Sequence, residues 1–158
     1  MTRPLPKFAV ALGLAGLLPF IAASLGATAF QGDWADRSLL ALLAYGATIL
    51  AFLGGVHWGL ALLDERTERV QRLRYGLGVL PSLMGWGALL VTFIGLPRTG
   101  LLLMLAGFIA VTAVEARASR AGLMPHSYMW LRWVLSGGVV VCLATVLLVR
   151  AFGGRIVL

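Results

Sequence analysis

The sequence predicts an all-α integral membrane protein, built as one domain from a bundle of five transmembrane helices. Of its 158 residues, 60% are hydrophobic and only 12% are charged, whereas a soluble domain is about half apolar and a quarter charged. The apolar residues gather in long uncharged runs, which is the pattern of membrane spans. These runs do not alternate between polar and apolar residues as barrel strands do, so they favour helices.

The boundaries of the five spans follow from the lengths of the uncharged runs. A hydrocarbon core about 30 Å thick requires about 20 helical residues, and the first three runs meet this length. The fourth run is short, so we assign Glu115 to its last turn. The fifth extends back through Arg132 to Tyr128, because an arginine side chain can reach the interface from within a span. The predicted spans are residues 8–30, 38–63, 75–96, 99–116 and 128–150.

The first run also has features of a secretory signal. Arg3 and Lys7 give it a basic start, and the small residues Ala27, Thr28 and Ala29 resemble a cleavage site. The run is longer than the apolar part of a usual signal peptide. We therefore expect an uncleaved first span.

The basic residues predict the orientation of the chain in the membrane. Nine of the thirteen lie on the side that holds the N-terminus, and four lie on the other side. Basic residues favour the cytoplasmic side. We therefore expect the bacterial inner (cytoplasmic) membrane, with the N-terminus cytoplasmic and the C-terminus outside, or the mitochondrial inner membrane in a eukaryote. The nine are Arg3, Lys7, Arg66, Arg69, Arg72, Arg74, Arg117, Arg120 and Arg132, and the four are Arg37, Arg98, Arg150 and Arg155.

The net charge of +7 does not indicate nucleic-acid binding, which requires a solvated basic face. Here the charges flank apolar runs, so membrane lipids are the expected contacts. With Cys142 as the single cysteine, the chain cannot form an intramolecular disulfide or a CxxC metal site. His57 and His126 have no zinc-ligand spacing, and His126 falls in a connecting segment, which disfavours a bis-histidine haem. We therefore expect no metal, no cofactor and no catalytic residue.

The second span carries a stripe of small residues. Gly55 and Gly59 form a GxxxG pair, a pattern that allows close approach of another membrane helix. Together with the adjacent Gly54, they are predicted to be helix-packing residues.

His57 lies six residues before the end of its run and so about 9 Å along a helix. It shares one helix face with Gly46, Leu50, Gly54, Ala61 and Asp64, a stripe of small and weakly polar residues. Ionisable groups inside a membrane are candidates for function, although a structural histidine bonded to a neighbouring helix is the alternative. We take His57, Trp58 and Glu115 as candidate contacts for a ligand or a partner. Glu115 is the preferred polar neighbour of His57, and Arg117 or Arg120 could neutralise its charge instead.

Several stretches of the chain resemble a known family. They are residues 12–20, the central stretch from Tyr45-Gly46-Ala47 to Phe52-Leu53-Gly54-Gly55-Val56-His57-Trp58-Gly59, residues 80–83, and residues 125–128 with Leu131-Arg132. Over its whole length the chain is similar to a domain-of-unknown-function family of bacterial and mitochondrial membrane proteins that includes mitochondrial transmembrane protein 69. The resemblance implies a membrane fold and no particular activity. It also implies that arginine can replace His57, which suits a cationic contact better than a metal ligand.

Short connections, glycine-rich helix faces and the lack of a catalytic constellation favour a non-enzymatic function. We expect an accessory or assembly subunit of a larger inner-membrane complex, such as an energy-transducing one, or a homo-oligomer. The bacterial and mitochondrial occurrence of the family is the basis for energy transduction. A binder of quinone, lipid or tetrapyrrole near His57 and Trp58 is the first alternative, and a membrane enzyme is the second. The odd number of spans and the absence of an inverted repeat disfavour transport.

Overall fold

The computed structural model describes residues 6–62, 68–120 and 126–152, and nearly all of these residues are helical. Arg3, Arg66 and Arg155, which entered the prediction of orientation, lie outside these ranges. The helices are α1 (Lys7–Ala15), α2 (Leu18–Ala29), α3 (Asp33–Leu62), α4 (Glu68–Phe93), α5 (Pro97–Arg120) and α6 (His126–Phe152).

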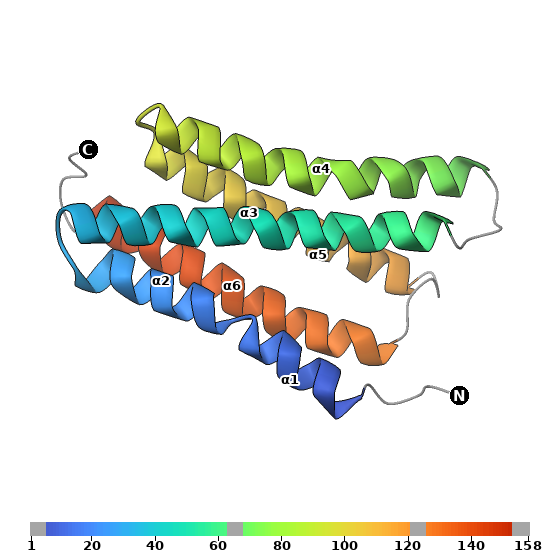
Figure 1. Ribbon diagram of the computed structural model, residues 1–158. Coiled ribbons are helices and arrows are strands. Elements are labelled where there is room, and N and C mark those ends of the chain that lie inside the picture. Colours follow the sequence, from blue (N-terminus) through green and yellow to red (C-terminus); the bar gives the residue numbers. More distant parts are fainter. Residues whose placement is uncertain (1–5, 63–67, 121–125, 153–158) are drawn as a thin grey trace.

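The six helices form five membrane-length segments, because α1 and α2 together make the first one (Figure 1). The predicted all-α class and its five spans are confirmed. Several helices extend beyond the predicted uncharged runs, since charged residues can stabilise helix ends. The first turn of α3 contains Asp33 and Asp36, and the last turn of α5 contains Arg117 and Arg120, in each case with the sign that complements the helix dipole.

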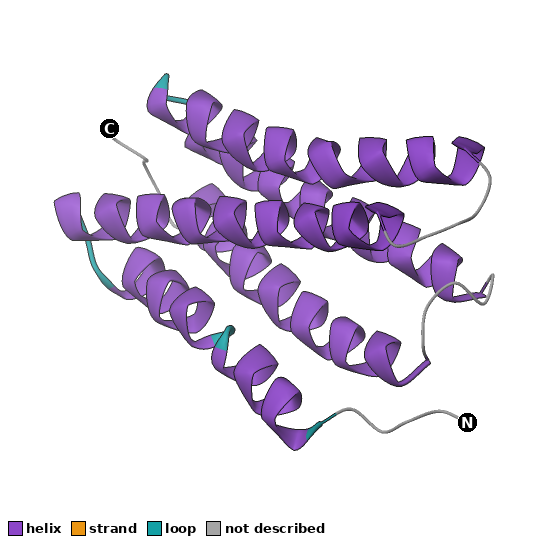
Figure 2. Cartoon of the chain, turned by 45° about the vertical axis from the view of Figure 1, so that its right-hand side comes forward, coloured by secondary structure: helices purple, strands orange, loops and turns teal. Residues whose placement is uncertain are grey.

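The first span is broken near its middle, a feature that the sequence analysis did not predict. Helix α1 ends before Gly16, and α2 begins at Leu18 with Pro19 in its first turn (Figure 2). Proline has no backbone N–H, and its ring clashes with the carbonyl four residues earlier, so the helix cannot continue unbroken through this point. The hydroxyl of Tyr45 in α3 donates a 3.1 Å hydrogen bond to the carbonyl of Gly16, which satisfies a backbone group freed by the break.

The core of the bundle lies around α3, which packs against α2, α4 and α5. Phe20 of α2 contacts Tyr45 of α3 and Phe108 of α5 through edge-to-face ring pairs, with centroids 5.0 Å and 5.8 Å apart. Such pairs stabilise a fold by about 0.5–1.5 kcal/mol beyond the burial of their area. The described residues with fully buried apolar side chains also include Leu42, Leu43, Leu50, Met104, Leu143 and Val146.

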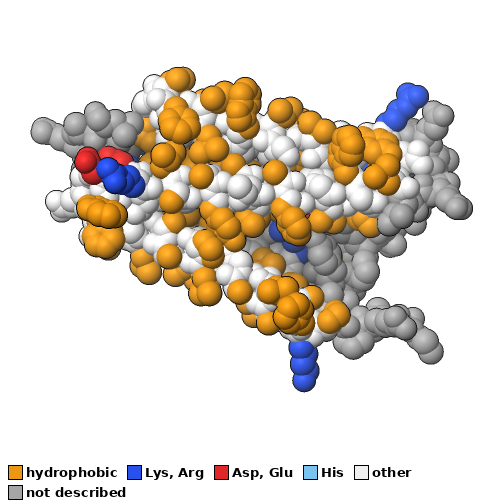
Figure 3. All heavy atoms as spheres, viewed as in Figure 1, with side chains coloured by type: hydrophobic (Ala, Val, Ile, Leu, Met, Phe, Trp, Pro, Cys, Tyr) orange, Lys and Arg blue, Asp and Glu red, His pale blue; other side chains and the backbone are white. Residues whose placement is uncertain are grey.

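The outer surface of the bundle is apolar along its length. Hydrophobic side chains cover the face seen in Figure 3, and most of the visible charged side chains stand near its two ends. Phe52 and Trp86 are more than half exposed although both lie within spans. A large contiguous apolar surface of this kind is unusual for a soluble monomer, and lipid tails would cover it in a membrane.

An ion pair joins α3 to α6 at the end of the bundle where α3 and α5 begin. Arg150, in the last turn of α6, places Nη1 2.9 Å from Oδ1 of Asp36 in α3. Arg98 of α5 donates a 3.1 Å hydrogen bond to the backbone oxygen of Arg150. Three helices therefore meet through polar contacts at this end, and a second polar cluster lies toward the opposite end.

Candidate functional site

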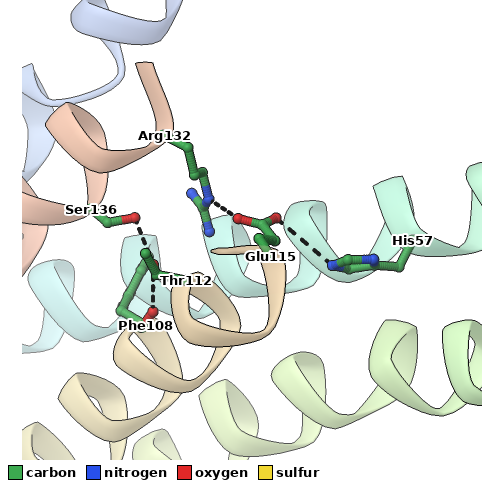
Figure 4. A network of polar contacts seen from close by, with 6 residues as sticks. All are labelled: His57, Phe108, Thr112, Glu115, Arg132 and Ser136. Atoms are coloured by element: carbon green, nitrogen blue, oxygen red, sulfur yellow. Dashed lines mark hydrogen bonds and ion pairs between the residues drawn. The ribbon is translucent and has the colours of Figure 1, made fainter. Parts of the chain in front are cut away.

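Three ionisable side chains meet inside the bundle, each from a different helix. His57 comes from α3, Glu115 from α5 and Arg132 from α6 (Figure 4). Their exposed fractions are only 4%, 0% and 5%. All three helices have the length and composition of membrane spans, so the cluster, here called the polar triad, is buried in a region where charged groups are costly.

The centre of the polar triad is an ion pair between Glu115 and Arg132. The Nε–H of Arg132 donates a short hydrogen bond to Oε2 of Glu115. Both side chains are buried from bulk water, so each charge depends on the other for compensation. The pair therefore links α5 to α6 and allows a carboxylate to lie within the bundle.

Arg132 is the site residue that sequence reasoning missed, because its side chain was expected to reach the membrane interface. Arg117 and Arg120, the alternatives considered for neutralising Glu115, are exposed. Helical spacing explains the difference. Glu115 lies on the buried face of α5 together with Val111 and Thr112, whereas Arg117 is two residues further on and so points about 200° away around the helix.

His57 lies beside the carboxylate of this pair. Its Nε2 atom is 3.7 Å from Oε1 of Glu115, so the preferred neighbour named from the sequence is in contact range. This separation exceeds that of a hydrogen bond, which is about 2.7–3.2 Å. Among the residues that the structure describes, three buried atoms of the polar triad have no hydrogen-bond partner: His57 Nε2, Glu115 Oε1 and Arg132 Nη2.

A second polar contact joins α5 to α6 one helical turn deeper in the bundle. Thr112 Oγ1 is hydrogen-bonded to the backbone oxygen of Phe108 and to Ser136 Oγ, each at 2.8 Å. Thr112 precedes Glu115 by three residues, and Ser136 follows Arg132 by four. Residues at these spacings share a helix face, so polar residues repeating at helical spacing within apolar runs were the signal that could have identified this interface.

The close approach of α3 to α4 is made at Gly54. A side chain on Gly54 would overlap the backbone carbonyl of Gly78 in α4, so this crossing requires a glycine. Small residues permit such contacts between membrane helices. Among the described residues, the predicted contact of Gly55 and Gly59 with another helix is not formed, since a Cβ atom on either glycine would meet none of their atoms within 4 Å. One residue turns a helix by about 100°, so the face that buries Gly54 leaves Gly55 outward.

Trp58 contacts α4 and does not join the polar triad. Its indole N–H donates a 3.1 Å hydrogen bond to the backbone oxygen of Tyr75, and the two rings pack edge to face at 5.3 Å. The indole also lies against Gly78, where a side chain would collide with it. The polar atom of Trp58 is therefore used in helix packing, although 44% of the residue is exposed.

The chemistry of the polar triad follows from its composition. It holds one carboxylate, one guanidinium and one imidazole, so the charges of Glu115 and Arg132 offset each other. Within residues 6–62, 68–120 and 126–152, no group of three or more His, Cys, Asp or Glu residues is placed to hold a metal ion. The side chains of the polar triad can hold α3, α5 and α6 together and can donate and accept hydrogen bonds.

Fold and site together define a multi-pass helical membrane protein with a buried ionic cluster. A family model described as "Protein of unknown function (DUF3429)" matches residues 5–148, and the chain belongs to this family. Two relatives are the proteins called Transmembrane protein 69 from Xenopus tropicalis and from Mus musculus. They are 41% and 34% identical to the chain over 85 residues.

These matches cover 54% of the chain but only 33% and 34% of the two relatives. The chain therefore matches about a third of the length of each of these relatives, and their names state only that they are transmembrane proteins. No solved structure matches the chain.

Proposed function

We propose that this protein is a non-enzymatic accessory or assembly subunit of a larger membrane complex, and that it binds its partner through the outward face of α3. The observation that carries the proposal is the pair Gly55 and Gly59. Both are exposed, and both have open space where a side chain would stand. We call this pair the glycine strip.

The energetics of glycine in a helix support this assignment. Glycine inside a helix is about 0.5–1 kcal/mol less favourable than alanine. At Gly54 this cost is offset, because the glycine permits the contact with α4. Gly55 and Gly59 have no such contact with the described part of the chain, and lipid tails gain nothing from a missing side chain. A transmembrane helix of another subunit, packed across the glycine strip, would provide the compensating contacts.

The polar triad supports a structural function rather than catalysis. Glu115 is fully buried and bound by Arg132, so its carboxylate serves to join two helices. The first alternative, binding of a small ligand, is favoured by the unpaired atoms of the triad, whose chemistry is treated in the next subsection.

The same proposal places the chain in the bacterial inner membrane, or in the mitochondrial inner membrane of a eukaryote, with its N-terminus on the cytoplasmic or matrix side. The described basic residues at that end of the bundle include Lys7, Arg72, Arg117 and Arg120, all of them exposed. An excess of arginine and lysine favours the cytoplasmic side. A complex in energy transduction is one setting that suits both membranes.

Purification from native membranes tests the proposed partner contact. The tagged parent protein, extracted in a mild detergent, should migrate on a native gel as a complex larger than its own 16.8 kDa. Gly55→Leu and Gly59→Leu should each release the partner, because a leucine side chain would separate the two helices.

Gly137→Leu is the matched control. Gly137 lies in α6, and it too is exposed with no atom of the described residues within 4 Å of an added Cβ. It differs from the glycine strip because no second glycine lies four residues away from it, so it does not form the GxxxG pattern that packs membrane helices. This variant should keep the complex. If all three variants co-purify with the same partner as the parent does, the glycine strip is not the interface and the proposal is wrong.

A further inference from the structure

The three unpaired atoms of the polar triad have complementary chemistry, and two of them, His57 Nε2 and Glu115 Oε1, are 3.7 Å apart. Arg132 Nη2 can only donate a hydrogen bond, and Oε1 of an ionised Glu115 can only accept one. His57 Nε2 can do either, depending on its tautomer. Each belongs to a side chain at least nine-tenths buried, and none has a partner among the described residues.

Leaving such atoms unpaired is costly. A buried donor or acceptor without a partner lowers stability by about 1–3 kcal/mol, and by more when the group is charged. Buried polar atoms in native proteins are accordingly bonded to protein or to ordered water. Three unpaired atoms at one site therefore indicate a bound group that satisfies them.

The spacing limits the size of that group. His57 Nε2 and Glu115 Oε1 are 3.7 Å apart, which is too far for a direct hydrogen bond. A single oxygen atom placed about 2.8 Å from each would bond to both. Glu115 Oε1 requires an O–H donor, and the same oxygen must also donate to His57 Nε2 or accept from it. A hydroxyl group or a water molecule can do both.

We infer that His57 and Glu115 bind one hydroxyl oxygen, supplied either by a buried water or by the hydroxyl of a lipid headgroup, while Arg132 holds the carboxylate in place. His57 lies five residues before the end of α3 at Leu62, about 7.5 Å along the helix axis, so the headgroup region is near. Water molecules that bridge buried polar groups typically make about three hydrogen bonds, and His57 and Glu115 supply two of them. The inference is independent of the proposed subunit contact, because the glycine strip lies outside the polar triad.

Solid-state NMR with 15N-labelled histidine tests this site directly. The chain contains only two histidines, so the imidazole region is simple, and a His126→Gln variant assigns the His57 signals. The full-length protein is reconstituted in two membranes. One consists of phosphatidylcholine, whose headgroup has no hydroxyl, and the other contains phosphatidylglycerol, whose headgroup does.

The two membranes distinguish the two sources. Magnetisation transfer from water protons to His57 Nε2 in the phosphatidylcholine membrane would identify the group as water. Transfer from the carbon-bound protons of the headgroup glycerol, which only the phosphatidylglycerol membrane contains, would identify it as the lipid headgroup. In either case the transfer should be lost in a Glu115→Leu/Arg132→Leu double variant, which removes the carboxylate and the arginine paired with it.

Two results would overturn the inference. One is the absence of transfer from either source in both membranes. The other is transfer of equal intensity in the double variant, since this would show that His57 is hydrated without the other two residues. Subunit co-purification from native membranes is a separate measurement, so failure of the proposed partner contact would not affect this result.

Discussion

Glu115 of α5 and Arg132 of α6 form an ion pair inside a membrane-spanning bundle, with 0% and 5% of these residues exposed. The Asp36–Arg150 pair at the opposite end differs, because the side chain of Asp36 is 30% exposed. Burial determines what each pair contributes. Solvent competes with an exposed pair, whereas the loss of one partner from a buried pair leaves an uncompensated charge.

We expect Glu115→Leu and Arg132→Leu, made singly, to destabilise the protein strongly. Removing one partner of a buried pair costs about 3–5 kcal/mol. The double variant should be considerably more stable than the sum of the single effects, because neither charge is then left alone. A double-mutant cycle measured by unfolding in mixed detergent micelles checks this. Strictly additive effects would show that the two residues do not interact.

We expect Asp36→Asn to have a much smaller effect. A pair with a partly solvated partner stabilises a protein by about 0–1 kcal/mol, and asparagine can still accept a hydrogen bond from Arg150. In the same unfolding assay, Asp36→Asn should lower the stability of the protein by less than either Glu115→Leu or Arg132→Leu does. An equal or larger decrease would mean that the bundle depends mainly on its Asp36 end.

The sequence predicted the spans correctly because span length and hydrophobicity are local properties. The five uncharged runs of the sequence correspond to the five membrane-length helical segments of the structure. The break near Gly16 was missed although Pro19 was visible, since proline is tolerated in many membrane helices and the hydrogen bond from Tyr45 to Gly16 depends on tertiary contact. Several boundaries shifted outward for a related reason, because charged residues such as Asp33 and Arg120 can occupy helix ends, whereas α4 ends at Phe93, before the predicted boundary at residue 96.

The site was predictable only in part because it depends on how each helix is rotated. Composition identified His57 and Glu115 as ionisable residues on one side of the membrane, and they lie 3.7 Å apart. Which glycine faces α4 depends on a rotation of about 100° per residue, and the structure places Gly54 rather than Gly55 at that contact. The pairing of Arg132 with Glu115 requires α5 and α6 to be adjacent, which the sequence alone does not reveal.

The crossing of α3 and α4 should tolerate no side chain at its closest point. Gly54→Ala and Gly78→Ala should each destabilise the protein by about 1–3 kcal/mol, the usual cost of overpacking, because the added methyl group would meet backbone or the Trp58 ring. Gly55→Ala is the control, and it should be neutral or slightly stabilising because alanine favours helix. Thermal unfolding of the three purified variants checks this, and equal stability of all three would contradict the crossing geometry.

We expect the odd number of spans to place the two chain ends on opposite sides of the membrane. A reporter fused after Val70 should be active in the cytoplasm, and one fused after Leu158 should be active outside it. The basic residues on the Val70 side are the reason, since they retain that side in the cytoplasm. Paired alkaline phosphatase and fluorescent-protein fusions measure this. Reporters active on the same side would rule out the five-span topology.

The proposed partner contact on α3 is tested most directly by site-specific photocrosslinking in native membranes. A photoreactive phenylalanine analogue replaces Phe52, which is 68% exposed and lies three residues before Gly55 on the same face of α3. In a parallel sample it is placed at Gly137, an open position outside the glycine strip. Our account predicts a discrete protein adduct from position 52 and none from position 137, with the same adduct lost when Gly55→Leu is added. Crosslinks to lipid alone from both positions would contradict it.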